Sequence, residues 1–222
     1  MKPYVICHMM TSVDGRIDCP MTEQLPGVED YYETLDALHV GAMIFGRVTA
    51  ELEMADPGKF EKQDESIGAF AFAKNGESVC YTVILDTKGT LRWDGYAEKD
   101  SLIIVTSEKA SKAYLDYLST LGISWIACGK ESIDLEKALD VLYENFGVKR
   151  VAVVGGALCN TGFLSAGLLN EISLLIGAGI DGRGGMPAVF DGRPENAPVM
   201  KLSLQSAKAM ESGAVWIRYL VQ

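Results

Sequence analysis

The residues best suited to chemistry lie where apolar runs end at glycine. In residues 151–158, four small apolar residues lead into Gly155 and Gly156 and then into helix-compatible residues. Glycine lets the backbone approach a ligand closely, and the free N–H groups of a helix's first turn favour an anion. This order is typical of a seat for nucleotide phosphates, although a strand–helix turn without a ligand has the same pattern.

A second apolar run, residues 40–45, ends at Gly46 and is followed by Arg47, Thr49 and good helix formers. The planar guanidinium of Arg47 can grip a phosphate, and Thr49 can cap the turn or bond a phosphate oxygen. The alternative is a capped helix with a solvated arginine. Two such turns in one chain predict a dinucleotide, one turn for each part. The G-x-G-x-x-G fingerprint is absent, which disfavours a standard Rossmann fold.

Three further polar residues follow the first apolar run or begin the first helical pattern. Ser12 and Asp14 can hydrogen-bond a polar substrate, or they can simply form an Asp-Gly turn with Gly15. Asp30 can stabilise the helix macrodipole, or it can be a proton donor that faces a cleft.

Hydrophobic periodicity supplies the elements that must hold these residues. Apolar runs predict strands, amphipathic spacing predicts helices, and the two alternate along the chain, which favours a mostly parallel sheet. Two alternating runs around residues 211–213 predict a closing antiparallel hairpin. The expected strands are 4–10, 40–45, 79–85, 101–105, 123–128, 150–154, 171–176, 199–208 and 214–221. The expected helices are 29–39, one from 47, one opened by Thr106-Ser107-Glu108 and reaching 121, 134–146 and 155–169.

Composition bounds the class of protein. The chain has 222 residues, 48% of them hydrophobic, and a formal net charge of −10, which argues against nucleic acid or an anionic membrane as a partner. No apolar run reaches about 18 residues, and the N-terminus leads directly into a strand, so we expect neither a membrane span nor a signal peptide. Five cysteines without metal spacing and only two histidines predict a cytoplasmic protein with no metal site.

Several short motifs occur in the order of a known family. They are residues 11–15 (Thr-Ser-Val-Asp-Gly), residues 41–46 (Gly-Ala-Met-Ile-Phe-Gly) with Thr49, Asp56-Pro57, Val83-Ile-Leu-Asp86, Val105-Thr-Ser107, and Gly155-Gly156 with residues 163–169. Through this ordered set, which covers nearly the whole chain, the sequence resembles the reductase domain of bacterial riboflavin biosynthesis, the C-terminal domain of a bifunctional deaminase/reductase. More broadly it is similar to the dihydrofolate-reductase-like fold.

The resemblance implies a single α/β reductase domain over residues 1–222, without the deaminase domain, whose sheet carries helices on both faces. It implies an NADPH-dependent oxidoreductase acting on a pyrimidine-type heterocycle; in the riboflavin enzyme, C1′ of a ribosylamino sugar is reduced to give a ribitylamino product. Arg47 suits the 2′-phosphate, because the same Gly-Arg-x-Thr occurs in dihydrofolate reductases. The implied cofactor contacts are Thr11, Gly46, Arg47, Thr49, Ser107, Gly155, Gly156, Ala157 and Leu158, and the implied substrate contacts are Ser12, Asp14 and Asp56.

The sequence departs from the family's pattern at two positions. The lysine usual four residues before the matched serine is His8, and the acidic residue usual before the glycine pair is Val154. His8, Asp14 and Asp30 are therefore the candidate catalytic proton donors. Asp30 lies sixteen residues before Gly46, the spacing of the catalytic acid in dihydrofolate reductases, so a pterin reductase is an alternative. A non-catalytic nucleotide-binding module is an alternative of another class.

The alternating strands at the C-terminus also bear on the oligomeric state. An exposed sheet edge is a template for pairing with another chain. We therefore expect a homodimer, with the small heterocyclic substrate as the other partner.

Overall fold

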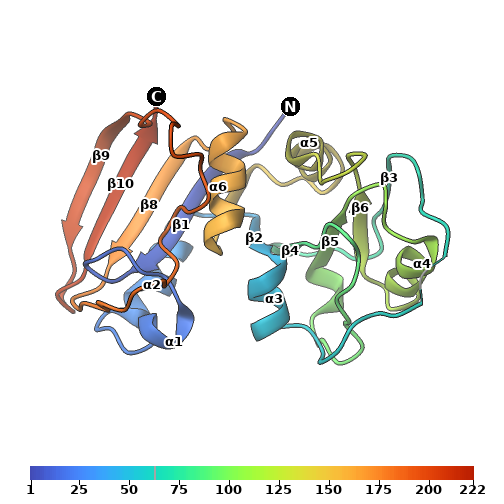
Figure 1. Cartoon of the computed structure of the whole chain (residues 1–222), viewed down its shortest axis with the longest axis horizontal. Helices are drawn as coiled ribbons and strands as arrows, with labels where there is room; N and C mark the ends of the chain where they lie inside the picture. The colour runs from blue at the N-terminus through green and yellow to red at the C-terminus, as the bar shows by residue number, and fades with distance from the viewer. Residues whose placement is uncertain (63) are drawn as a thin grey trace. The chain divides into compact units, whose positions relative to one another are not determined.

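The computed structural model describes residues 1–62 and 64–222, and the chain separates into two units (Figure 1). Unit 1 comprises Met1–Pro3 and Gly41–Lys149, and unit 2 comprises Tyr4–Val40 and Arg150–Gln222. Each unit is an α/β layer structure with its own strands and helices, so the functional residues are described unit by unit.

The strands of unit 2 lie in the order β7-β1-β8-β10-β9. The first strand, β1, runs parallel to both β7 and β8, whereas β10 runs antiparallel to β8 and β9. Figure 1 shows the β9–β10 hairpin, in red, beside β8. The bounds are β1 (Tyr4–Thr11), β7 (Arg150–Val153), β8 (Glu171–Ile176), β9 (Leu202–Ala209) and β10 (Val215–Val221). The predicted antiparallel hairpin is confirmed.

Helices cover both faces of the unit 2 strands, and β1 shows this through two neighbouring residues. The ring of His8 stacks on Tyr31 of α2, with centroids 4.8 Å apart. Burial raises the pKa of the Cys7 thiol, and Cys159 of α6 adds to this shift, which places α6 near Cys7. Adjacent strand residues point to opposite faces, so α2 and α6 cover opposite faces. The helices are α1 (Cys19–Thr22), α2 (Val28–Asp36) and α6 (Ala157–Ser165).

Unit 1 has four parallel strands in the order β2-β4-β5-β6, with the short strand β3 antiparallel to β6. Its strands are β2 (Ala42–Gly46), β3 (Ala71–Ala73), β4 (Tyr81–Leu85), β5 (Leu102–Thr106) and β6 (Ser124–Ala127). Its helices are α3 (Arg47–Glu53), the short 3₁₀ turn η1 (Lys99–Ser101), α4 (Lys112–Thr120) and α5 (Leu135–Asn145).

A hydrophobic core of unit 1 lies between the strands and the helices α3 and α4. It includes Ala50, Ile84, Ile104, Tyr114 and Leu118, all fully buried. The other face is covered at α5, where Phe146 meets Tyr81 of β4 edge to face. Parallel strands with apolar residues on both faces need helices on both sides, which is the predicted architecture.

Two sequence-based expectations about helix starts are wrong. Thr106 and Ser107 do not open a helix, because Thr106 ends β5 and α4 begins only at Lys112, capped by the Ser111 side chain, which accepts a hydrogen bond from the Tyr114 N–H. Thr49 is not a cap, because it lies inside α3, whose N-cap is Gly46. Within residues 1–62 and 64–222, no helix is both long and apolar enough to cross a bilayer.

Candidate functional site

In unit 2, the turn between β7 and α6 is built from Gly155 and Gly156. Gly155 has φ +116, a backbone conformation that favours glycine, and a Cβ there would lie 3.2 Å from Met9 Cε. Gly156 is the N-cap of α6 and has no side chain with which to cap the first turn. The first-turn N–H groups, beginning at Ala157, are therefore available to an anionic ligand. Leu158 beside them is 72% exposed.

Two polar side chains of α6 were not anticipated from the sequence. Asn160 is fully buried, and its amide nitrogen donates to the carbonyl of Val189 over 2.8 Å. In the part of the chain that the structure describes, neither Asn160 Oδ1 nor the buried hydroxyl of Thr161 has a hydrogen-bond partner. Buried polar atoms are rarely left without a hydrogen-bond partner. Asn160 Oδ1 and the Thr161 hydroxyl therefore indicate that α6 can bind a further polar group. Their position in the opening turns of an apolar helix was the available signal.

In unit 1, the corresponding turn joins β2 to α3 at Gly46. Arg47 is the first residue of α3, and its guanidinium forms an ion pair with Glu51 one turn along the helix. Both side chains are more than a third exposed, so this pair is weak and can exchange for another anion. At this turn the Arg47 guanidinium is therefore oriented by Glu51 but remains accessible to solvent.

The other two predicted contacts of unit 1 hold loops together. The buried hydroxyl of Ser107 donates to the carbonyl of Thr87 over 2.8 Å, joining the turns that follow β5 and β4. The carboxylate of Asp56 accepts the N–H of Gly95 over 2.9 Å. Of the predicted residues in this unit, Gly46, Arg47 and Thr49 lie together, whereas Asp56 and Ser107 lie in separate loops.

After β1 of unit 2, Thr11, Ser12 and Asp14 form one hydrogen-bonded turn. The Thr11 hydroxyl donates to the Ser12 carbonyl over 2.9 Å, and the buried Ser12 hydroxyl donates to Asp14 Oδ1 over 2.7 Å. Hydrogen bonds from Ser12 and from two backbone N–H groups lower the pKa of Asp14 well below its usual range. Asp14 is therefore ionised near neutral pH and has no proton to donate.

His8 lies in a buried polar chain beneath α2. The Trp216 indole N–H donates to Ser173 Oγ over 2.8 Å, and the same oxygen lies 2.9 Å from His8 Nδ1. With Ser173 accepting from Trp216 and donating to Nδ1, the His8 proton is assigned to Nε2, which lies 3.4 Å from the Tyr31 carbonyl. Burial lowers the pKa of His8 to about 4, so the ring is neutral near pH 7.

A second buried polar group on the same strands is the Glu171 carboxylate. It accepts from Arg218 Nε over 2.6 Å and from the Tyr4 hydroxyl over 3.1 Å. The Glu171 side chain is 1% exposed, so hydrogen bonds from these two partners offset the cost of burying it. The pairs join residues 47 and 167 positions apart, which no local pattern in the sequence reveals.

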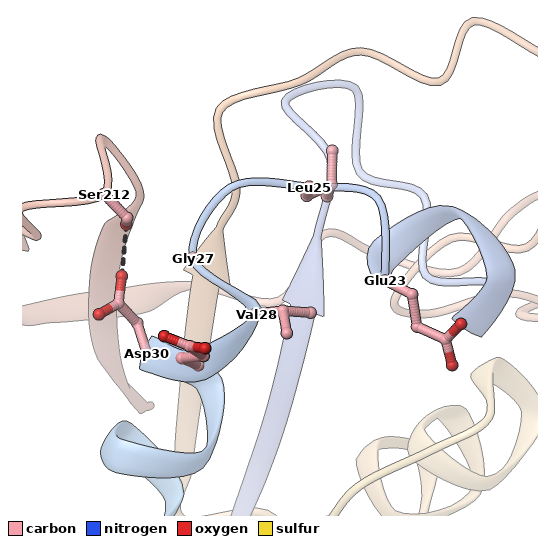
Figure 2. A pocket seen from close by; sticks show the side chains of 7 residues that line it. Glu23, Leu25, Gly27, Val28, Asp30 and Ser212 are labelled. Carbon is pink, nitrogen blue, oxygen red and sulfur yellow. Dashed lines mark hydrogen bonds between the residues drawn. The ribbon is translucent and has the colours of Figure 1, made fainter.

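Asp30 lines a pocket of about 260 Å³ at the N-terminus of α2. Its carboxylate accepts a hydrogen bond from Ser212, in the turn of the β9–β10 hairpin, and Figure 2 shows this contact at one side of the pocket. Leu25 forms an apolar part of the lining. The lining residues are Glu23, Leu25, Gly27, Val28, Glu29, Asp30 and Ser212. Among residues 1–62 and 64–222, no three His, Cys, Asp or Glu side chains lie together in a way that could hold a metal ion.

The predicted residues of unit 2 thus fall into three groups. Gly155, Gly156, Ala157 and Leu158 form the anion-binding turn, and Thr11, Ser12 and Asp14 form the turn after β1. His8 and Asp30 are linked through α2: Thr34 Oγ1 lies 3.5 Å from His8 Nε2 and donates to the Asp30 carbonyl over 2.7 Å.

Comparison with known proteins gives concordant results. A 73-residue segment is 38% identical to the 2,5-diamino-6-ribosylamino-4(3H)-pyrimidinone 5′-phosphate reductase of Aquifex aeolicus; it covers 33% of this chain and 32% of that relative. The fold resembles that of a pyrimidine reductase-like protein of Corynebacterium diphtheriae, with TM-score 0.73 and 17% identity over 99% of this chain and 92% of the other.

Two riboflavin-biosynthesis proteins also share the fold. RibD of Acinetobacter baumannii gives TM-score 0.72 at 19% identity, with all of this chain matching 58% of that one. The riboflavin biosynthesis reductase Rib7 of Saccharomyces cerevisiae gives TM-score 0.65 at 19% identity over 100% of this chain and 90% of the other. The RibD C-terminal domain family itself matches residues 3–216, from the first strand to the last, and the chain therefore belongs to that family.

Proposed function

We propose that this chain is an NADPH-dependent reductase that acts on a ribosylamino-pyrimidine. The observation that carries the proposal is the Gly155–Gly156 turn, which leaves the N-terminus of α6 open in a chain of the RibD C-terminal domain family. The name of the Aquifex relative supports the choice of substrate class. The match of the family over residues 3–216 supports one reductase domain that includes both units.

In this proposal a bound nicotinamide cofactor would supply a hydride to C1′ of the sugar; the bond between C1′ and the ring oxygen breaks, and that oxygen takes up a proton, which gives the open-chain ribitylamino product. The chain binds and orients the reactants. The open N–H groups of the first turn of α6 hold a phosphate of the cofactor. The carboxylates beside α2 accept hydrogen bonds from amino and ring N–H groups, which places the heterocycle in the pocket that Asp30 lines.

The preference for NADPH over NADH rests on Arg47. Its guanidinium is more than a third exposed and is paired with an equally exposed carboxylate, that of Glu51, on the same helix. A 2′-phosphate carries more charge than that carboxylate and can take both edges of the guanidinium. We therefore assign the 2′-phosphate to Arg47.

A second function, reduction of a pterin, is favoured by one observation: Asp30 lies in a pocket at the start of α2. In that reading Asp30 is the proton donor. Neither His8, which is neutral, nor Asp14, which is ionised, offers a readily released proton near pH 7.

The deciding experiment measures oxidation of NADPH with the purified chain and either the ribosylamino-pyrimidine 5′-phosphate or dihydrofolate. Reduction of the first compound alone supports the proposal, and reduction of the second alone supports the pterin reading. Tight NADPH binding with no turnover of either compound would support the third hypothesis, a non-catalytic nucleotide-binding module.

We also propose a homodimer formed through β9 and β10. The strand β9 lies at the edge of the sheet, and all of its residues are exposed. Leu202, Leu204 and Leu220 on this hairpin are 38%, 61% and 39% exposed. An apolar, unpaired edge is suited to contact with a second copy.

A further inference from the structure

Two loops begin side by side at the end of the unit 2 strands. Thr11, which ends β1, lies opposite Ile176, which ends the parallel strand β8. The loop after β8 returns to the loop after β1 through two backbone hydrogen bonds. The Gly177 N–H donates to the Thr11 carbonyl over 2.8 Å, and the Val13 N–H donates to the Gly179 carbonyl over 2.8 Å.

The side chain that joins the two loops is Asp14. Its Oδ1 accepts from the Ser12 hydroxyl over 2.7 Å and from the Asp181 N–H over 3.0 Å, and its Oδ2 accepts from the Gly182 N–H over 3.0 Å. Arg16 Nε lies 4.0 Å from Oδ2. Both oxygens are therefore used, and two of the donors belong to the opposite loop.

The loop after β8, residues 177–185, is rich in glycine and therefore depends strongly on contacts that order it. Five of the nine residues from 177 to 185 are glycine, and glycine loses the most conformational freedom when it is ordered. Glycine also lets this loop pack tightly: a Cβ on Gly177 would lie 2.9 Å from Leu25 Cδ1, and a Cβ on Gly179 would clash with Leu25 Cδ2. Leu25 is part of the pocket lining beside α2 (Figure 2).

Other contacts between the loops lie farther along the chain. Arg183 Nη2 donates to both carboxylate oxygens of Asp18, over 3.0 and 2.9 Å, but the arginine side chain is 51% exposed. Arg16 Nη1 donates to the Met186 carbonyl over 2.7 Å. Of these side-chain contacts between the loops, the one made by Asp14 lies closest to Gly179. Because Gly179 packs against Leu25, Asp14 has the most direct effect on the position of Leu25.

We propose that Asp14 is a positioning residue for the reductase rather than its proton donor. Its ionised carboxylate fixes the glycine loop against the loop after β1, and the fixed glycine loop holds Leu25 as a wall of the substrate pocket. The role in the pocket rests on the proposed function, whereas the coupling between the loops does not.

The first test needs no substrate. In Asp14→Asn one carboxylate oxygen becomes an NH₂ group, which cannot accept from an N–H. Hydrogen exchange read by mass spectrometry should rise about tenfold in residues 177–182 and in residues 12–16 together, the size expected for losing a hydrogen bond to a charged group. The control is Asp191→Asn, because Asp191 accepts the Ala188 N–H over 2.8 Å within its own loop. That variant should change exchange only near residue 188. Unchanged exchange at 177–182 in Asp14→Asn would overturn the coupling.

The second test is kinetic. Asp14→Asn should raise KM for the pyrimidine about tenfold, with a smaller change in kcat. The shape of the kcat–pH profile should stay that of the wild type, because no titrating donor has been lost. Gly179→Ala keeps Asp14 but pushes on Leu25, and it should raise KM in the same way. If instead kcat falls steeply and recovers in acid, Asp14 is the proton donor and the positioning role is wrong.

The two failures are separable. If the wild type reduces no pyrimidine but Asp14→Asn frees both loops, the proposed function fails and the coupling stands. If the wild type is active and Asp14→Asn changes neither exchange nor KM, the proposal about Asp14 fails alone.

Discussion

His8 keeps a neutral ring because burial penalises its charged form more than the Tyr31 carbonyl and Ser173 favour it. Its pKa falls from 6.5 to about 4, so between these pH values the unfolded chain binds a proton at this site that the folded chain does not. Lowering the pH through this window therefore favours unfolding. One such group costs about 3 kcal/mol of stability by pH 4.

We expect His8→Gln to flatten the pH dependence of stability between about pH 7 and pH 4, measured by urea unfolding. The variant should be less stable than the wild type at pH 7, because it loses the stacking on Tyr31. His39→Asn is the matched control, since His39 is exposed and its φ of +50 suits asparagine. An unchanged pH slope in His8→Gln would show that His8 is not the group responsible.

Arg47→Gln should weaken NADPH binding by roughly 1.5–3 kcal/mol, the worth of a charge-assisted phosphate contact, and leave NADH binding nearly unchanged. Glu51→Gln removes the carboxylate that holds Arg47 and should strengthen NADPH binding. Calorimetric titration with both cofactors measures these changes. The control is Lys109→Gln, because Lys109 is likewise paired with an exposed carboxylate, that of Glu131. An equal loss of affinity for NADPH and NADH in Arg47→Gln would show that Arg47 does not bind the 2′-phosphate.

Asp30→Asn separates the two heterocycle readings. If Asp30 is a general acid, as the pterin reading requires, kcat should fall by about 10²–10⁴, and the deficit should shrink in acid, where solvent supplies the proton. If Asp30 only binds a pyrimidine, KM should rise and the pH profile should keep its shape. Steady-state kinetics with both substrates across the pH range distinguishes the outcomes.

The turn before α6 gives a prediction about an element. Gly156→Val places a branched side chain where the phosphate should meet the first turn, so cofactor binding should be lost while the protein still melts cooperatively. Gly184→Val is the control, because a Cβ at Gly184 meets nothing within 4 Å. Unchanged cofactor affinity in Gly156→Val would make this turn purely structural.

The longer strands were predictable from the sequence, whereas the short strand β3 (Ala71–Ala73) and some helix ends were not, for a physical reason. Buried parallel strands such as β5 (Leu102–Thr106) are nearly continuous apolar runs, which stand out in any window. A cap depends on which hydroxyl reaches which N–H. Ser107 looked like a cap, but its hydroxyl is used by Thr87, and Ser111 caps α4 instead.

The strand–glycine–helix turns at Gly46 and at Gly155–Gly156 were predictable because they depend on local backbone. Contacts between residues far apart in the chain were not predictable. Asp14 meets Asp181 and Gly182 across more than 160 residues, and this distant contact changes its expected role from proton donor to positioning residue. The neutrality of His8 likewise comes from packing between β1, β8 and α2, not from its neighbours in sequence.

At the level of the assembly, Leu204→Glu should convert the proposed dimer to a monomer, measured by light scattering. A charge at this exposed edge position opposes burial against a second copy. Val79→Glu adds the same charge at an exposed apolar position outside β9 and β10 and serves as the control. A wild-type monomer at all concentrations would contradict the proposed dimer.

The order of the chain in unit 2 has a consequence for how the protein is made. β1 is synthesised well before both of its neighbours, β7 and β8, which follow only after residue 149. Unit 1 is almost continuous in sequence and can assemble while translation proceeds. β1 must meanwhile wait, with an apolar strand unpaired, for more than half of the chain to be synthesised. During synthesis, this strand therefore exposes its apolar surface until β7 and β8 have been made.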